Sequence, residues 1–271
     1  SSSEQSITEP EQAVNVLDSL AGDVFVGRQR EMDDLKAALE DALGGRGRMV
    51  TLVGEPGIGK TRTAQELATY AGLRGCQVLR GRCYEEQGVP PYWPWVQAFR
   101  SYVQDSDGEA LGTELGASVG DLVEIVSDIR NRSPDVSLPL QLNDPEQERF
   151  RLFDSVCAFL KTASGKQPLI ILLDDLQWSD VPSLLLLQFI ARELSGTRIL
   201  IVGTYRDADL GRRHPLVETL GELIRETLFE RVRLHGLTSD DVQRFIEMTS
   251  DINPTDSLVQ AVHGQTDGNP L

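Results

Sequence analysis

The sequence has no apolar run long enough to cross a membrane, so we expect no transmembrane helix and no membrane partner. Its first residues are polar and lack the apolar core of a signal peptide. Cysteine is scarce: Cys76, Cys83 and Cys157 are an odd number without a disulfide framework, which indicates a reducing compartment and a cytoplasmic location. The three histidines show no metal-ligand spacing, so we assign them no role.

Basic residues are also few, with 26 Lys and Arg against 42 Asp and Glu and a net charge of −16. A chain this acidic repels nucleic acid and anionic lipid, so we expect no direct nucleic-acid contact. The sequence lacks an initiator methionine and stops at Leu271 in what reads as the middle of an element. We therefore expect a piece of a longer protein, whose other domains are its partners.

Short apolar runs alternate with segments of helical periodicity along the chain. We expect strands at residues 49–53, 77–82, 169–173, 198–204 and an edge strand near 232–234, with helices at 32–43, 61–72, 95–103, 121–129, 150–160, 183–194 and 216–223. Strands that alternate with helices favour a parallel sheet covered on both faces. The expected fold class is therefore α/β, with three layers.

The segment 54–61 carries the strongest motif, Gly-Glu-Pro-Gly-Ile-Gly-Lys-Thr, which fits the phosphate-binding pattern G-x-x-x-x-G-K-[ST] between an expected strand and an expected helix. Glycines let successive N–H groups face phosphate oxygens, and the helix N-terminus favours negative charge. Lys60 is expected to contact the β- and γ-phosphates and to assist catalysis, and the Thr61 hydroxyl to bind Mg²⁺. The residues assigned to nucleotide binding here are Glu55, Pro56, Gly57, Ile58, Gly59, Lys60, Thr61 and Arg62.

A P-loop also needs an acidic residue at the tip of a buried strand, and Asp174 and Asp175 follow the apolar run 169–173. We assign Asp174 to Mg²⁺ and Asp175 to polarising the attacking water as general base. Two adjacent carboxylates repel each other, so a cation would explain why they are tolerated. The alternative is that both acids merely cap the following helix.

Around this P-loop the sequence resembles the STAND class of AAA+ ATPases, in the form found in large ATP-binding LuxR-type regulators and beside nucleotidyl cyclases. The resemblance covers about residues 24–271 and adds four motifs, at residues 25–28, 174–180, 203–206 and 268–270. It implies that Val26, Gly27 and Arg28 lie along the adenine, that Pro270 packs on it, and that Arg206 senses the γ-phosphate. The residues also allow plainer roles: Arg28 as a surface arginine, Arg206 paired with a nearby aspartate, and Pro270 as a helix stop.

The expected organisation is a linker or docking segment at 1–21, a P-loop domain at 22–235 with a helical insert at about 85–145, and the start of a truncated helical lid at 236–271. In the insert, the aromatic segment 91–95 fills the core or contacts an effector, and residues 131–145 form a loop. In the lid, Thr238 and Asp241 form a capping box, and a second helix starts at Asn253 and Pro254 and ends at Gly264.

The expected ligands are ATP or ADP with Mg²⁺, and the expected activity is slow hydrolysis by the nucleotide switch of a larger signalling or transcription-regulatory protein. No arginine finger is recognisable; Arg192, Arg212 and Arg213 are loose candidates. Nucleotide-dependent self-association is a further option for such a switch. Two alternatives stay open, an actively turning-over AAA+ remodeller or loader and a non-hydrolysing scaffold held together by its nucleotide.

Overall fold

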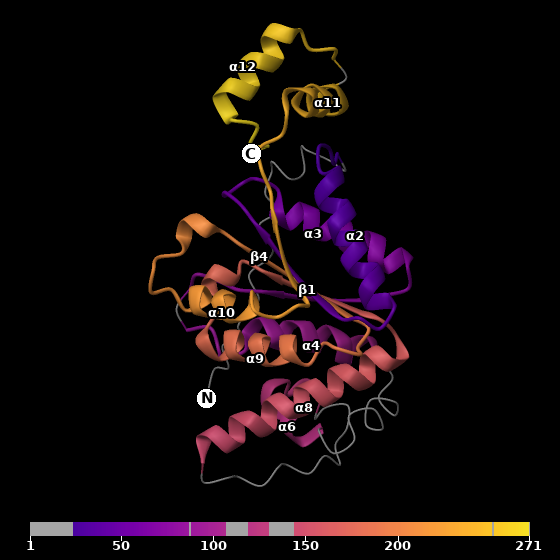
Figure 1. Ribbon diagram of the computed structural model, residues 1–271, viewed down its shortest axis with the longest axis vertical. Helices are drawn as coiled ribbons and strands as arrows, with labels where there is room; N and C mark the ends of the chain where they lie inside the picture. Colours follow the sequence, from indigo (N-terminus) through magenta and orange to yellow (C-terminus); the bar gives the residue numbers. More distant parts are fainter. Residues whose placement is uncertain (1–23, 87, 107–118, 130–143, 251, 271) are drawn as a thin grey trace, which may run out of the picture. The chain divides into compact units, whose positions relative to one another are not determined.

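The structure, a computed structural model, describes residues 24–86, 88–106, 119–129, 144–250 and 252–270 (Figure 1). The chain divides into two compact units: a sheet unit, Arg30–Leu234, and a helical unit that joins residues 24–29 to residues 235–270. The segment 24–29 thus belongs to the helical unit. The expected domain boundaries at 1–21, 22–235 and 236–271 stay predictions.

The sheet unit is built on a five-stranded parallel sheet with strand order β2-β3-β4-β1-β5. The strands are β1 (Arg48–Val53), β2 (Gln77–Arg82), β3 (Leu169–Asp174), β4 (Ile199–Tyr205) and β5 (Phe229–Arg233). The three central strands β3, β4 and β1 consist almost entirely of buried residues, as a parallel sheet covered on both faces requires. The expected parallel α/β sheet is confirmed, and so is the position of β5 at its edge.

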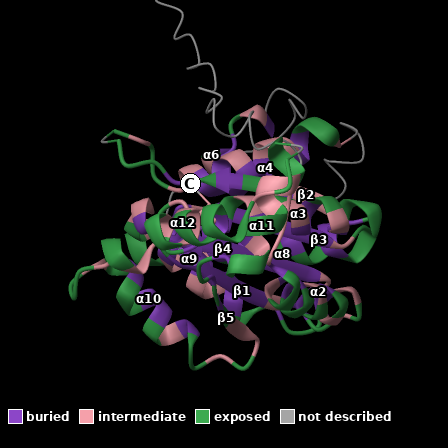
Figure 2. Cartoon of the chain, turned by 90° about the horizontal axis from the view of Figure 1, so that it is seen from above, coloured by how far each residue is buried: buried purple, intermediate pink, exposed green. Residues whose placement is uncertain are grey.

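Helices cover both faces of this sheet (Figure 1). One layer consists of α2 (Gln29–Leu43) and α3 (Lys60–Leu73); the other contains α4 (Trp93–Asp105), α9 (Val181–Arg192) and α10 (Pro215–Leu223), with α8 (Pro145–Lys166) packed on α9 and α6 (Val119–Ile125) packed on α8. Figure 2 shows the buried residues concentrated in the strands and on the inner sides of the helices. The expected three-layer arrangement is therefore confirmed.

The last residue of the aromatic segment 91–95, Trp95, packs into the hydrophobic core. Trp95 is fully buried, its ring lies 5.8 Å from that of Phe99, and its Nε1 donates to the Ser183 carbonyl at 3.1 Å. Burial of a tryptophan together with its N–H bond is a strong packing contribution. For Trp95 the core-packing alternative is confirmed.

The predicted loop at residues 131–145 falls mostly outside the described residues, but its end is wrong. Pro145 is the first residue of α8, and Asp144 is its N-cap, with the carboxylate accepting from Glu146 N at 2.9 Å. Proline suits the first turn of a helix because its missing N–H has no partner to lose there.

The helical unit contains α11 (Ser239–Ser250) and α12 (Asp256–Thr266) around a small core of Leu237, Val242 and Val259. The predicted capping box is confirmed: Asp241 N donates to Thr238 Oγ1 and Thr238 N donates to Asp241 Oδ2, both at 3.2 Å.

The predicted ends of α12 are wrong. The N-cap is Thr255, whose hydroxyl accepts from Leu258 N at 3.4 Å, so Asn253 and Pro254 precede the helix. Gly264 lies inside the helix, which ends where Asp267 takes the left-handed conformation with φ 50°. The Thr255 hydroxyl and the left-handed Asp267 set these ends, and a helix tolerates one interior glycine.

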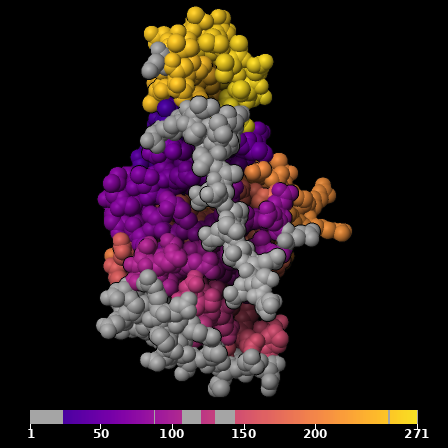
Figure 3. Space-filling model, turned by 180° about the vertical axis from the view of Figure 1, so that it is seen from behind, coloured from indigo at the N-terminus to yellow at the C-terminus, as the bar shows by residue number. Residues whose placement is uncertain are grey.

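The surface of the described residues is shown from one side in Figure 3, where the remaining residues are grey. Within the described ranges, none of the helices combines the length and the apolar character needed to cross a membrane.

Candidate functional site

The segment 54–59 connects β1 to α3 at the carboxyl end of the sheet. Gly59 has φ 98°, a left-handed conformation that a residue with a Cβ would adopt only with strain. The N-cap of α3 is Gly59, which has no side chain, so no side-chain hydrogen bond caps the first turn of this described helix. The first turn of this helix therefore presents backbone N–H groups and the positive end of the helix dipole, which suit a phosphate.

Lys60 is buried at 7% exposure and folds back over this loop. Its Nζ donates to the carbonyls of Gly54 at 2.8 Å and Glu55 at 2.7 Å. An ammonium has three donors, so one direction remains for a phosphate oxygen. Burial lowers the pKa of Lys60, and the nearby Arg206 guanidinium lowers it further, while Asp175 and other carboxylates partly oppose the shift.

Thr61 and Asp174 meet in the way that a magnesium site needs, although they are 113 residues apart. The Thr61 hydroxyl lies 3.0 Å from Asp174 Oδ2 and 3.1 Å from Oδ1. Within the described ranges, no group of three or more His, Cys, Asp or Glu side chains is placed so that it could hold a metal ion. A hydroxyl and one carboxylate beside a phosphate loop still fit Mg²⁺, which takes few protein oxygens and completes its shell with water and phosphate oxygens.

Asp175 occupies a strained and buried position directly after β3. It is 8% exposed and takes a left-handed conformation with φ 59°. Its Oδ1 accepts from Gln177 Nε2 at 3.0 Å, and its Oδ2 lies 3.2 Å from the Arg82 guanidinium. Such conformations persist where surrounding contacts over-determine them, often at functional sites.

Arg206 follows β4 and faces the same carboxylate. Its guanidinium lies 4.0 Å from Asp175 Oδ1 and 3.9 Å from Asp209 Oδ2, with about a third of the side chain exposed. Arg206 therefore pairs with Asp209, as the plainer role expected, and it also lies beside Asp175. Both the sensor role and the plainer ion-pair role remain compatible with this geometry.

Three residues that received no role from the sequence complete the site: Thr204, Gln177 and Arg82. The Thr204 hydroxyl donates to Asp174 Oδ1 and accepts from Asp175 N at 3.0 Å. The carboxylates are therefore each held by protein donors, and a cation is not needed to explain their proximity. Gln177 and Thr204 lie in the motifs at residues 174–180 and 203–206, which were the available signal. No signal in the sequence pointed to Arg82, whose approach depends on the pairing of β2 with β3.

Arg62, also assigned to the nucleotide, points along α3 toward Glu66, with a 3.6 Å separation of charges. The assigned residues Glu55, Pro56, Gly57 and Ile58 lie in the loop itself. In that loop Ile58 N donates to Glu55 O at 3.3 Å, which closes a turn.

The residues expected along the adenine belong to the helical unit. Arg28 is 4% exposed, and its guanidinium donates to the His235 carbonyl at 2.6 Å, so the surface-arginine alternative is wrong. Val26 packs on the core of this unit, and Pro270 is half-buried. The structure brings Lys60, Thr61 and the acidic strand end together in one unit and Val26, Gly27, Arg28 and Pro270 in the other; the adenine role of the second group stays a prediction.

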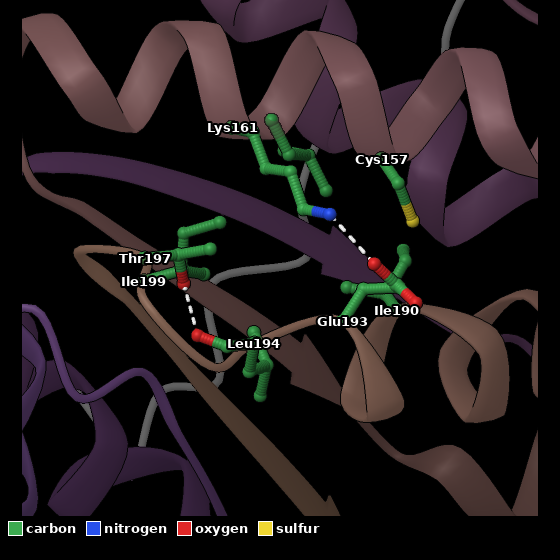
Figure 4. A pocket seen from close by; sticks show the side chains of 8 residues that line it. Cys157, Lys161, Ile190, Glu193, Leu194, Thr197 and Ile199 are labelled. Atoms are coloured by element: carbon green, nitrogen blue, oxygen red, sulfur yellow. Dashed lines mark hydrogen bonds and ion pairs between the residues drawn. The ribbon is translucent and has the colours of Figure 1, made fainter.

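A small pocket lies at the opposite, amino edge of the sheet, between α8, α9 and the start of β4 (Figure 4). Lys161 Nζ and Glu193 Oε2 form an ion pair at 2.6 Å beside it, and Cys157 lines it. Burial raises the pKa of the Cys157 thiol to about 12. This pocket shares no residue with the phosphate loop.

Comparison with solved structures finds similar chains at low identity. They are the Orc1 protein of Aeropyrum pernix in complex with DNA (18% identity, TM-score 0.44, 87% of this chain and 53% of that chain), a STAND protein with a tetratricopeptide repeat sensor from Pyrococcus horikoshii (18%, 0.47, 91% and 28%) and PCH-2 of C. elegans (14%, 0.42, 86% and 50%). The chain spans about half of the Orc1 and PCH-2 chains and less of the STAND protein. No curated protein sequence matches this chain.

The AAA ATPase domain family matches residues 24–202. The match includes the phosphate loop, the acidic strand end and the first part of β4. It covers well over half of the 271 residues, so this chain belongs to the AAA ATPase domain family.

Proposed function

We propose that this chain binds Mg-ATP and hydrolyses it slowly to ADP, as the STAND-type nucleotide switch of a larger signalling or transcription-regulatory protein in the cytoplasm. Nucleotide binding and hydrolysis follow from membership of the family. The slow rate, the switch role, the cellular location and the partners in other domains or in other copies are the proposal.

The observation that carries the proposal is the meeting of Thr61 with Asp174 at 3.0 Å beside Lys60. Lys60 would bind the β- and γ-phosphates, while Thr61 and Asp174 would hold Mg²⁺. Bound there, Mg²⁺ would neutralise charge on the phosphate oxygens. Asp175 would orient the attacking water and accept its proton, and Arg206 would contact the γ-phosphate.

We expect slow turnover because no arginine finger, which a second copy of the chain would insert into the site, is identified among the described residues. An arginine finger is worth about three to five powers of ten in rate. Of the loose candidates, Arg192 is already paired with Glu222 at 3.5 Å and Glu226 at 3.4 Å. A turnover near 10 per second by the monomer, a typical enzyme value, would contradict the proposal and favour the turning-over remodeller.

A non-hydrolysing scaffold is the second candidate, and one observation favours it. Both carboxylate oxygens of Asp175 already have protein partners, Gln177 at 3.0 Å and Arg82 at 3.2 Å, which makes the group less available to water. Single-turnover measurements with radiolabelled ATP separate the two: ADP formation supports the switch, and intact ATP after many hours supports the scaffold.

The binding site is tested by titrating the chain with a fluorescent ATP analogue in the presence and absence of Mg²⁺. Wild type should bind more tightly with Mg²⁺, and Thr61→Ala should lose that gain because it removes the hydroxyl beside Asp174. Thr69→Ala, an exposed threonine on the same helix, is the matched control and should behave as wild type. If affinity were the same with and without Mg²⁺ in wild type, the assignment of Thr61 and Asp174 would be wrong.

A further inference from the structure

Gln177 lies between two residues that the proposed function places at the γ-phosphate, Asp175 and Arg206. It is only 2% exposed. Its Nε2 donates to Asp175 Oδ1 at 3.0 Å, and its Oε1 accepts from the backbone N–H of Arg206 at 3.2 Å. One amide therefore links the carboxylate after β3 to the end of β4.

The hydrogen bonds leave one orientation for this amide. With oxygen and nitrogen exchanged, an acceptor would face the Asp175 carboxylate and a donor would face the Arg206 N–H. Both contacts would then be repulsive. The two bonds thus depend on each other, because a single rotation of the side chain forms or breaks both.

The turn that carries Gln177 is held firmly in place. It begins at Asp175 with its left-handed backbone, and Trp178 N donates to Asp175 O at 2.9 Å. Leu176 packs directly on Gly203 of β4, where a Cβ would come within 2.5 Å of Leu176 Cδ1. The absence of a side chain at Gly203 lets the turn approach β4 closely, which places the amide within reach of both partners.

Burial of a polar amide is unfavourable unless its bonds are made, and an apolar side chain would fill the same space. The two hydrogen bonds therefore explain why an amide, and not an apolar side chain, occupies this buried position. Asp175 has a further partner in Arg82 on its other oxygen, 3.2 Å away, so that the two donors together set the plane of the carboxylate. Of the two donors to Asp175, Arg82 and Gln177, it is Gln177 whose bond to the backbone of Arg206 also ties the carboxylate to the end of β4.

We propose that Gln177 is a positioning residue, which couples the orientation of the Asp175 carboxylate to the position of Arg206. This inference rests on the proposed function, since it concerns the same site. Gln177 touches no reacting atom; it holds the group that does. Loss of its bonds should lower the rate of ATP cleavage and leave the affinity for ADP, which depends on Lys60 and the phosphate loop, nearly unchanged.

Two variants separate coupling from a merely structural role. Gln177→Glu keeps the acceptor for the Arg206 N–H and the shape of the side chain, but it replaces the donor to Asp175 by a second carboxylate. Gln177→Met keeps the approximate volume and removes both bonds. Gln65→Glu and Gln65→Met, at an exposed position on α3, are the matched controls. The measurements are the affinity for a fluorescent ADP analogue with Mg²⁺, the single-turnover rate of ATP cleavage, and the midpoint of thermal unfolding.

Both Gln177 variants should bind ADP within about threefold of wild type and cleave ATP on the order of 10²-fold more slowly, the loss that follows from misplacing a reacting group by about 1 Å. If Gln177→Met unfolds, Gln177→Glu decides the question, because it keeps the bond to the strand. A Gln177→Glu variant that cleaves ATP as fast as wild type overturns the inference alone. A wild-type chain that binds ATP and never cleaves it overturns hydrolysis in the proposed function, and the inference with it.

Discussion

Replacing Lys60 by alanine removes the charge that lies on the phosphate loop. In the structure its Nζ donates to Gly54 O at 2.8 Å and to Glu55 O at 2.7 Å. A hydrogen bond from a charged donor contributes about 1.5–3 kcal/mol, but the freed carbonyls can bind water, and removal of a buried ammonium also removes its desolvation penalty. The free energy of unfolding should therefore fall by about 1–3 kcal/mol, which a domain stable by about 5–15 kcal/mol tolerates.

The effect on nucleotide affinity should be larger than the effect on stability. Loss of one partner from a buried, hydrogen-bonded charge pair costs about 2–5 kcal/mol, which corresponds to a loss of affinity of about 30-fold to several thousand-fold. Isothermal titration with Mg-ATP measures the affinity, and urea unfolding measures the stability. Lys161→Ala, which removes an exposed lysine paired with Glu193 at 2.6 Å, is the control and should leave the affinity unchanged.

Two results would refute the reasoning. Wild-type affinity in a folded Lys60→Ala variant would show that the ammonium does not contact the phosphates. Equal losses of affinity in the Lys60 and Lys161 variants would show a general effect of charge in a chain of net charge −16, rather than a contact.

Four further outcomes follow from the same structure. Thr204→Val keeps the shape of the side chain but leaves Asp174 and a backbone N–H without its hydroxyl, so urea unfolding should show a loss of about 1–3 kcal/mol; an unchanged midpoint would contradict this. Arg206→Ala should weaken binding of ATP and leave binding of ADP unchanged in paired titrations, because ADP has no γ-phosphate to contact; equal weakening of both would remove the sensor role. The thiols of Cys83 and Cys157 are buried, and burial raises the pKa of each to about 12, so neither should react with a disulfide reagent at about pH 8 until the chain unfolds; rapid reaction in the folded state would contradict their burial. Since unfolded thiols ionise near about pH 8.5, these two groups stabilise the fold fully below that pH and progressively less as the pH rises toward about 12, which unfolding measured across that range tests.

Local signals in the sequence predicted much of the fold. The run 169–173 reads as a buried strand in any context because it is short, apolar and partly β-branched, and β3 is found there as Leu169–Asp174. The helix after the phosphate motif, α3, was likewise expected within a residue of its observed bounds. Helix ends were less predictable: Asn253 and Thr255 are both good N-caps, and their sequence alone does not say which hydroxyl or amide reaches the first turn.

The candidate site was predicted in its chemistry and not in its contacts. The motif supplied Lys60 and Thr61, because phosphate and Mg²⁺ binding require those residue types at adjacent positions. It did not supply the partners of Asp175: Arg82 lies 93 residues earlier, and its approach depends on β2 pairing with β3. Parallel pairing places the ends of distant strands side by side, and nothing in the periodicity of either strand encodes its neighbour.

By itself, therefore, the sequence determined the fold class, the phosphate loop and the acidic strand end, since each depends on residue types within a short window. Only the tertiary structure decided the strand order β2-β3-β4-β1-β5 and with it the contacts among Thr61, Asp174 and Thr204 and the bridge that Gln177 makes. The physical reason is that hydrogen bonds between side chains act over about 3 Å, whereas the strand ends that carry those side chains are brought together by burial of the whole sheet.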